Sequence, residues 1–123
     1  MSLESIRDSI VSSLEGISGL KVHDHVPDAM HEFPAVAVRL YGANYTDSTF
    51  TFHLLLVARS WDEGGAALAL HPFLEASGPS SIKAALDADP GNVTLEVSTV
   101  ARRRINGVPY MTAQITVRAL DVP

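Results

Sequence analysis

Residues 93–120 decide the fold: they comprise VTLEVSTVARRRI, the dipeptide NG and VPYMTAQITVRAL. Asn106-Gly107 strongly favours a two-residue β-hairpin turn, because both central positions of that turn need the positive φ that Asn and Gly tolerate. After the turn, apolar side chains alternate with polar ones, which is typical of a strand with one buried face. The stretch therefore predicts a hairpin of strands 93–105 and 108–120. The expected apolar side consists of Met111, Ala113, Ile115, Val117 and Ala119.

Three more strands are expected ahead of this hairpin. Residues 20–26 form a short alternating stretch that ends before a proline, and residues 35–40 have the short apolar side chains of a central strand. Residues 49–59 form a long candidate strand whose even-numbered side chains are all apolar. Its other side is polar at the start and apolar toward the end, which predicts a strand that leaves the sheet partway or meets a partner. Between these strands, Gly, Asn and Asp predict a hairpin loop over 41–48.

Three helices complete the pattern. Apolar side chains recur every three or four residues over 3–15, and Gly16 ends that helix. An Ala-rich helix is expected over 63–75, with a kink or a restart at Pro72 because proline is costly inside a helix. A third helix is expected to begin at Ser77-Gly78-Pro79, with the proline near its first turn.

The order of these elements predicts the fold class. A chain of 123 residues fits one domain, over residues 1–123. Its 46% hydrophobic and 19% charged content excludes a disordered or fibrous protein. We predict an α+β fold: a mainly antiparallel sheet of about four to five strands, with the N-terminal helix and the central helical pair packed on one face.

Composition and charge exclude several function classes. The chain has no Cys, so it has no disulfide framework, Cys-based zinc site or thiol nucleophile. A formal net charge of −5 argues against a protein that binds nucleic acid by neutralising phosphate. No stretch reaches 18 apolar residues, so no membrane span is predicted. The first 13 residues include Glu4 and Asp8 and lack a basic region ahead of an apolar one, so we expect no signal peptide.

Candidate catalytic and metal-binding motifs are weak. On a strand, His23 and His25 would project to one side and could share an ion that a carboxylate or His31 completes. A lone His-x-His pair is unspecific, so we interpret these side chains as solvated and predict no metal site. The sequence also lacks the nucleophile-elbow and phosphate-loop patterns. We therefore predict no catalytic residue, no cofactor and no enzyme activity.

Several segments, taken in order, resemble one class of protein. Their combination resembles the tail terminator (tail completion) proteins of long-tailed bacteriophages, especially those that infect actinobacteria. The most distinctive piece is SGPSSIKAALDAD. The segments are SLESIRDSI (2–10), GISGLKV (16–22), VPD (26–28), FPAVAV (33–38), TFTFHLLLVAR (49–59), SGPSSIKAALDAD (77–89) and GVPYMTAQITV (107–117).

The resemblance implies a structural virion protein of the tail or neck, assembled in the host cytoplasm. Such proteins form a homo-hexameric ring that caps the tail tube, ends its polymerisation and joins the tail to the head. The implied partners are other copies of the chain, the major tail tube protein and the head–tail connector or stopper protein. DNA would pass through the lumen without specific binding, and we hypothesise that an acidic lumen repels it. The resemblance brings no catalytic residue with it.

A ring subunit needs contact surfaces, and the sequence indicates three: the 41–48 loop, the start of the 49–59 strand and the hairpin with arginines 102–104. Tyr41 and Tyr45 lie in the expected 41–48 loop, where exposed aromatic side chains favour contacts between proteins. The arginines 102–104 point to alternate sides of a strand, so they do not form one patch; they predict a solvated hairpin tip or ion pairs with a neighbour. The expected contact residues are Tyr41, Asn44, Tyr45, Asp47, Thr49, Thr51, His53, Arg102, Arg103 and Arg104.

Two alternative functions stay open at this point. One is another head–tail neck protein, an adaptor or a stopper, which would share the ring and the virion. The other is a small α+β ligand- or metal-binding enzyme domain that uses His23, His25 and His31.

Overall fold

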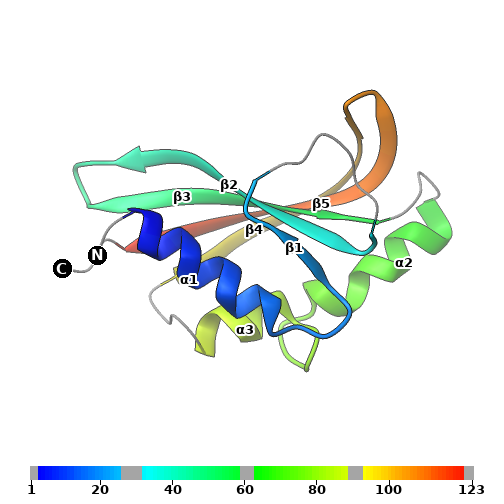
Figure 1. Cartoon of the computed structure of the whole chain (residues 1–123), viewed down its shortest axis with the longest axis horizontal. Helices are drawn as coiled ribbons and strands as arrows, with labels where there is room; N and C mark the ends of the chain where they lie inside the picture. Colours follow the sequence, from blue (N-terminus) through cyan, green and yellow to red (C-terminus); the bar gives the residue numbers. More distant parts are fainter. Residues whose placement is uncertain (1–2, 26–31, 59–62, 89–92, 121–123) are drawn as a thin grey trace.

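The computed structural model describes residues 3–25, 32–58, 63–88 and 93–120 (Figure 1). Its architecture is α+β, as the order of sequence patterns predicts. The helix over 3–15 and both strands of the last hairpin have the expected bounds. In chain order the elements are α1 (Leu3–Glu15), β1 (Lys21–His23), β2 (Ala35–Asn44), β3 (Thr49–Val57), α2 (Glu63–Leu74), α3 (Ile82–Ala88), β4 (Val93–Ile105) and β5 (Val108–Leu120).

One five-stranded sheet organises the chain, in the order β1-β2-β3-β5-β4. The short β1 runs parallel to β2, and every other neighbouring pair is antiparallel. All three helices lie on the same side of the sheet, which confirms the expected placement of the N-terminal helix and the central helical pair (Figure 1). The opposite side, called the polar face below, carries Arg39, Thr51, His53, Thr116 and Arg118.

The main core lies between the helices and the sheet. Apolar side chains at the helical spacing of α1 meet the even-numbered side chains of β3 and the odd-numbered ones of β5, as the two periodicities require. Burial of each large aliphatic side chain contributes about 1.5–3 kcal/mol to stability. The core residues that are at most 1% exposed include Ile6, Ile10, Leu14, Val36, Val38, Phe52, Leu54, Leu56, Leu70, Ile82, Leu86 and Ile115.

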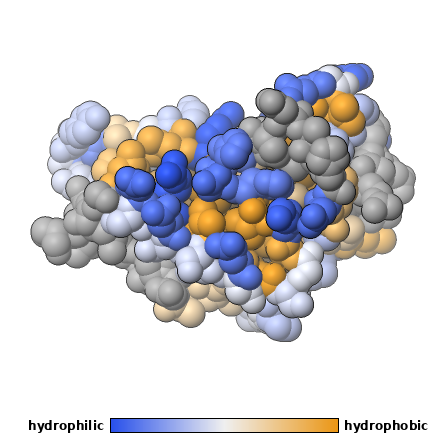
Figure 2. All heavy atoms as spheres, viewed as in Figure 1, coloured by the Kyte–Doolittle hydropathy of each residue, from blue (hydrophilic) through white to orange (hydrophobic). Residues whose placement is uncertain are grey.

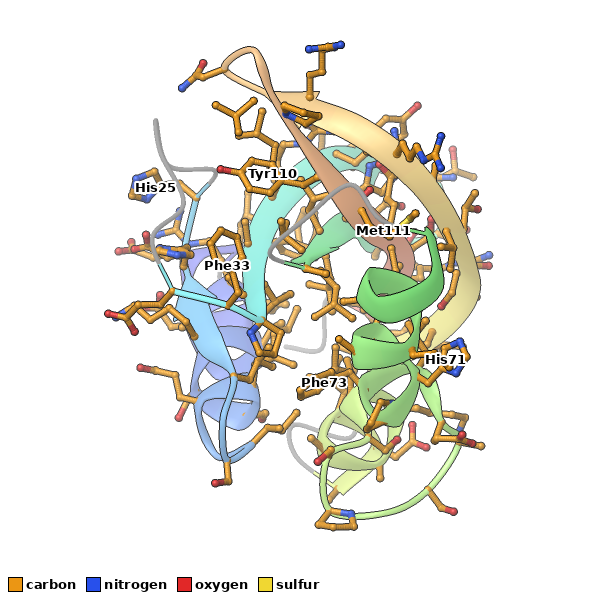
Figure 3. All side chains as sticks on the ribbon, turned by 90° about the vertical axis from the view of Figure 1, so that its right-hand side faces the viewer. His25, Phe33, His71, Phe73, Tyr110 and Met111 are labelled. Atoms are coloured by element: carbon orange, nitrogen blue, oxygen red, sulfur yellow. The ribbon has the colours of Figure 1, made fainter. Side chains whose placement is uncertain are left out.

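A second, smaller cluster lies on the polar side of the sheet and bends the β4–β5 hairpin. Tyr110 is 7% exposed and packs with Ile105, Ala35, Ala37 and Val57. The hairpin rises from the sheet on the side away from the helices (Figure 1), and the Tyr110 ring faces the Phe33 ring with centroids 5.5 Å apart (Figure 3). This cluster covers the apolar end of β3.

The second cluster corrects the prediction that the 49–59 strand leaves the sheet partway. β3 pairs with β2 and with β5 over all nine residues, from Thr49 to Val57. Its second side becomes apolar because the bent hairpin packs on Leu55 and Val57. The apolar end of this strand is therefore covered within the chain itself.

The structure also corrects the prediction of a hairpin loop over residues 41–48. β2 continues through Asn44, so only residues 45–48 form the connection to β3. The Asn44 Oδ1 atom accepts hydrogen bonds from the backbone N–H groups of Thr46 (2.9 Å) and Asp47 (3.4 Å), which closes the turn. A β-bulge between Leu40 and Gly42 accommodates the glycine within the strand. Turn-forming residues therefore mark a bulge here as well as a loop.

The helix boundaries differ from the expectation at two places. α2 runs through Pro72 to Leu74, so no new helix starts there; the proline lies in the last turn and has no N–H to donate to the carbonyl four residues earlier. α3 begins at Ile82, three residues after Pro79, because Ser81 caps it: the Ser81 Oγ atom accepts the N–H of Ala84 at 3.1 Å.

Candidate functional site

The polar face brings Arg39, Tyr41 and His53 together. Arg39 lies directly across from His53 in the β2–β3 register, with the guanidinium Nη2 atom 3.5 Å from the imidazole Nδ1 atom. Tyr41 stacks on the same imidazole, with ring centroids 4.2 Å apart and the planes 23° from parallel. The bulge after Leu40 is the local cause, because an extra residue in one strand re-aims the side chains that follow it. The Tyr41 side chain stays largely accessible, at 67% exposure.

Arg103 joins this group from the bent β4–β5 hairpin. It pairs in register with Tyr110, the residue that anchors the bend, and its own side chain is half-buried. Its Nε atom is buried and has no hydrogen-bond partner among the described residues. Burial lowers the pKa of His53, and the positive charges of Arg39 and Arg103 lower it further. We call these four residues, Arg39, Tyr41, His53 and Arg103, the basic–aromatic cluster.

The tip of the β2–β3 hairpin presents a second group. Tyr45 is 91% exposed, the highest exposure among the large hydrophobic side chains described. Besides the Asn44 turn, the tip is held by Thr49, whose Oγ1 atom donates to the Asp47 Oδ1 atom at 2.9 Å. Thr49 itself is only 5% exposed. Thr49 thus supports the tip from below, whereas Tyr45 and Asp47 are accessible to another molecule.

The other predicted contact residues are dispersed. Thr51 is half-buried beside Arg118 on the polar face. Arg102 and Arg104 are exposed, and the Arg104 Nη1 atom donates to the Gly107 carbonyl at 3.3 Å. Half-buried Arg103 lies between them, in keeping with the expectation that the three arginines do not form one patch. Arg39 was not predicted, since its role depends on the register with His53.

The structure describes two of the three histidines of the alternative metal site, His23 and His25. His23 is half-buried on β1, and burial lowers its pKa, with nearby Lys21 as a further cause. His25 points away from the body (Figure 3), with its Nδ1 atom 2.6 Å from the Asp24 carboxylate, whose pKa this contact lowers. His31 lies outside the described residues. Within residues 3–25, 32–58, 63–88 and 93–120, no group of three His, Asp or Glu side chains is arranged to hold a metal.

Two shallow hollows flank the β2–β3 hairpin. One, of about 410 Å³, is lined on the polar face by Asp47, Thr94 and Glu96 and by Arg118, which pairs with Glu96 at 2.6 Å. The other, of about 340 Å³, lies where α1 meets the hairpin. It is lined by Leu3, Glu4, Arg7, Leu40 and Phe52. Figure 2 shows apolar surface beside charged α1 side chains in this region.

The sequence matches no known protein family, and no curated protein matches it either. Among the described helices, none has the length and apolar character that crossing a membrane requires.

Proposed function

We propose that this chain is a tail terminator of a long-tailed bacteriophage: a structural virion protein of the tail or neck. Copies form a homo-hexameric ring that caps the tail tube, ends its polymerisation and presents a surface to the head connector or stopper. The proposal draws on the order of segments that resemble this class. Its main structural support is the accessible hairpin tip with Tyr45, which is 91% exposed, since tyrosine is enriched at the core of protein–protein interfaces.

The small domain offers what a ring subunit needs. A ring is built from heterologous contacts, in which one surface of each subunit meets a different surface of the next. The projecting hairpin tip and the basic–aromatic cluster are two such different surfaces: the tip ends the β2–β3 hairpin, and the cluster combines residues of that hairpin with Arg103 of β4. Neither calls for a catalytic role, so the proposed work of the protein is binding and shape.

The acidic net charge of the chain fits passage of DNA without specific binding. The chain has 14 acidic and 9 basic side chains, and an acidic lumen would repel phosphate. Because Arg39 and Arg103 make the basic–aromatic cluster locally positive, we assign that cluster to protein contacts and expect other, acidic surface to line the lumen. A lumen lined by basic side chains would contradict this part of the proposal.

Electron microscopy of tail tubes tests the proposed function. The purified protein is mixed with tubes of the tail tube protein encoded in the same viral genome, with tubes alone as the control. We expect a ring-shaped density of six subunits at one end of each tube. Bare tube ends at saturating protein would contradict the proposal. Binding to isolated connectors with bare tube ends would instead assign the neck adaptor or stopper function.

A further inference from the structure

The hairpin tip and the basic–aromatic cluster are complementary surfaces that cannot meet within one chain. The tip and three of the four cluster residues belong to the β2–β3 hairpin, whereas Arg103 comes from β4; Arg39 lies five residues before Asn44 at the start of the tip. At about 3.3 Å per strand residue, these positions are separated by roughly 17 Å along the strand. A contact between the two surfaces therefore needs a second molecule.

The cluster has unused hydrogen-bonding capacity for an anion. Among the described residues, neither Arg39 nor Arg103 has a carboxylate partner, and the buried Nε atom of Arg103 has no acceptor. A guanidinium group without a carboxylate partner can form charge-assisted hydrogen bonds with an incoming carboxylate. The tip supplies one: the Asp47 Oδ1 atom accepts a bond from Thr49 within the chain, and a carboxylate can accept several.

Charge favours a second copy of this chain over nucleic acid as the occupant. A nucleic acid would meet a molecule of net charge −5, and the same polar face carries Asp47 and Glu96 around the neighbouring hollow. These carboxylates would repel a continuous run of phosphates. A single carboxylate on a narrow hairpin tip avoids that repulsion and meets a cluster whose positive charge comes from Arg39 and Arg103.

We propose that the β2–β3 hairpin tip of one copy docks on the basic–aromatic cluster of the next copy. Asp47 pairs with Arg39 and Arg103, while Tyr45 packs against the exposed ring of Tyr41. Each copy gives its tip to one neighbour and receives the tip of another, which closes a ring when the rotation fits. This inference rests on the proposed function insofar as a ring needs such a repeated contact.

Cysteine cross-linking tests the contact directly, because the chain has no Cys of its own. Thr46 lies at the tip, and Thr116 lies beside His53 on β5, so Thr46→Cys and Thr116→Cys are introduced together. A disulfide needs Cα atoms within about 7 Å, and Thr116 lies across from His53, four strand residues from the start of β3, so the two positions are too far apart within one chain. Mild oxidation should give a ladder of covalent multimers on a non-reducing gel. The matched control joins Thr46→Cys with Lys83→Cys, an exposed position on α3. A ladder no stronger than the control would overturn the proposal.

A charge swap in the same cysteine background tests the pairing. Arg39→Asp and Asp47→Arg should each slow cross-linking about tenfold, and the two together should restore it to within about threefold of the parent. Circular dichroism checks that each variant is folded. A double variant no faster than either single variant would contradict the pairing of Asp47 with Arg39. If Arg39→Asp leaves cross-linking unchanged but abolishes binding of a short DNA duplex at low salt, the cluster is a nucleic-acid site.

The two proposals fail in distinguishable ways. Tubes that are still capped when the cysteine pair does not cross-link would overturn the hairpin contact and leave the terminator function intact. Cross-linked multimers that do not bind tube ends would overturn the terminator function and leave the contact intact.

Discussion

Tyr110→Ala is the perturbation that probes the bent hairpin most directly. Tyr110 is 7% exposed and its ring lies 5.5 Å from Phe33, so the substitution empties the second cluster. Truncation of a buried aromatic side chain costs about 3–5 kcal/mol, and we take about 3 kcal/mol because this cluster lies at the margin of the sheet. With roughly 2.1 cal/mol/K of unfolding entropy per residue, this loss corresponds to a melting temperature about 12 °C lower.

The same variant should act on the candidate site. If the Tyr110 anchor is lost, the hairpin no longer holds Arg103 near His53, and one cause of the lowered pKa of His53 is removed. We therefore expect the pKa of His53 to move up toward its ordinary value of about 6.5. NMR titration of the imidazole signals measures this shift, and thermal unfolding followed by circular dichroism measures the stability loss.

Tyr45→Ala is the matched control, because it removes the same side chain from a position that is 91% exposed. Its effect on the free energy of unfolding should stay within about 0.5 kcal/mol. Equal losses in Tyr110→Ala and Tyr45→Ala, or a loss below about 1 kcal/mol in Tyr110→Ala, would refute the role assigned to the second cluster. An unchanged pKa of His53 would refute the link between the hairpin and the basic–aromatic cluster.

Two further predictions concern the turn and the pH dependence. Gly107→Ala should lower the free energy of unfolding, measured in urea, by about 1–2 kcal/mol, because Gly107 has a φ of +81°. The control is Gly42→Ala, since Gly42 has no positive φ and open space around it. Equal losses in the two variants would contradict the strain argument. Because the folded pKa of His53 is lowered, the stability it contributes is present above its unfolded pKa and is lost as the pH falls through the folded value. The urea midpoint of unfolding should therefore fall as the pH is lowered from 7.5 to 5.5, and it should fall less steeply in His53→Gln. Equal pH dependence in the two proteins would count against burial and the charges of Arg39 and Arg103 as the cause.

The elements with a regular period could be predicted from the sequence. The four-residue spacing of Ile6, Ile10 and Leu14 identifies α1, and the alternation around the Asn106-Gly107 turn identifies the β4–β5 hairpin. Asn106 and Gly107 have φ values of 50° and 81°, as a two-residue turn of this type requires. In these elements, local preference and burial favour the same structure.

The rest depends on contacts between distant residues. Tyr41–Asn44 contains turn-forming residues, yet it continues β2 because β3 offers it a pairing partner and a bulge takes up the irregularity. The apolar end of β3 is covered by Tyr110, more than fifty residues later in the chain. The alternation of residues along β3 does not indicate which later segment of the chain covers its apolar end.

The candidate site could be predicted in part. Tyr41, Tyr45 and Asp47 were identifiable as exposed contact candidates, and the structure keeps the two tyrosines accessible. Thr49 was expected at a contact surface but is buried beneath the tip. Arg39 escaped prediction because only the strand register places it against His53. The sequence therefore indicates which side chains suit a contact surface. Which of them lie together depends on the strand register, the bulge in β2 and the bend of the β4–β5 hairpin.

Tube elongation tests the central claim most directly. Tail tubes of the same virus are incubated with a slight excess of this protein, the unbound protein is removed, and fresh tube subunits are added. If six copies cap a tube end, the length distribution should stay unchanged after the addition, while untreated tubes lengthen. Treated tubes that lengthen at the same rate as untreated ones would contradict the proposal that this chain terminates the tail.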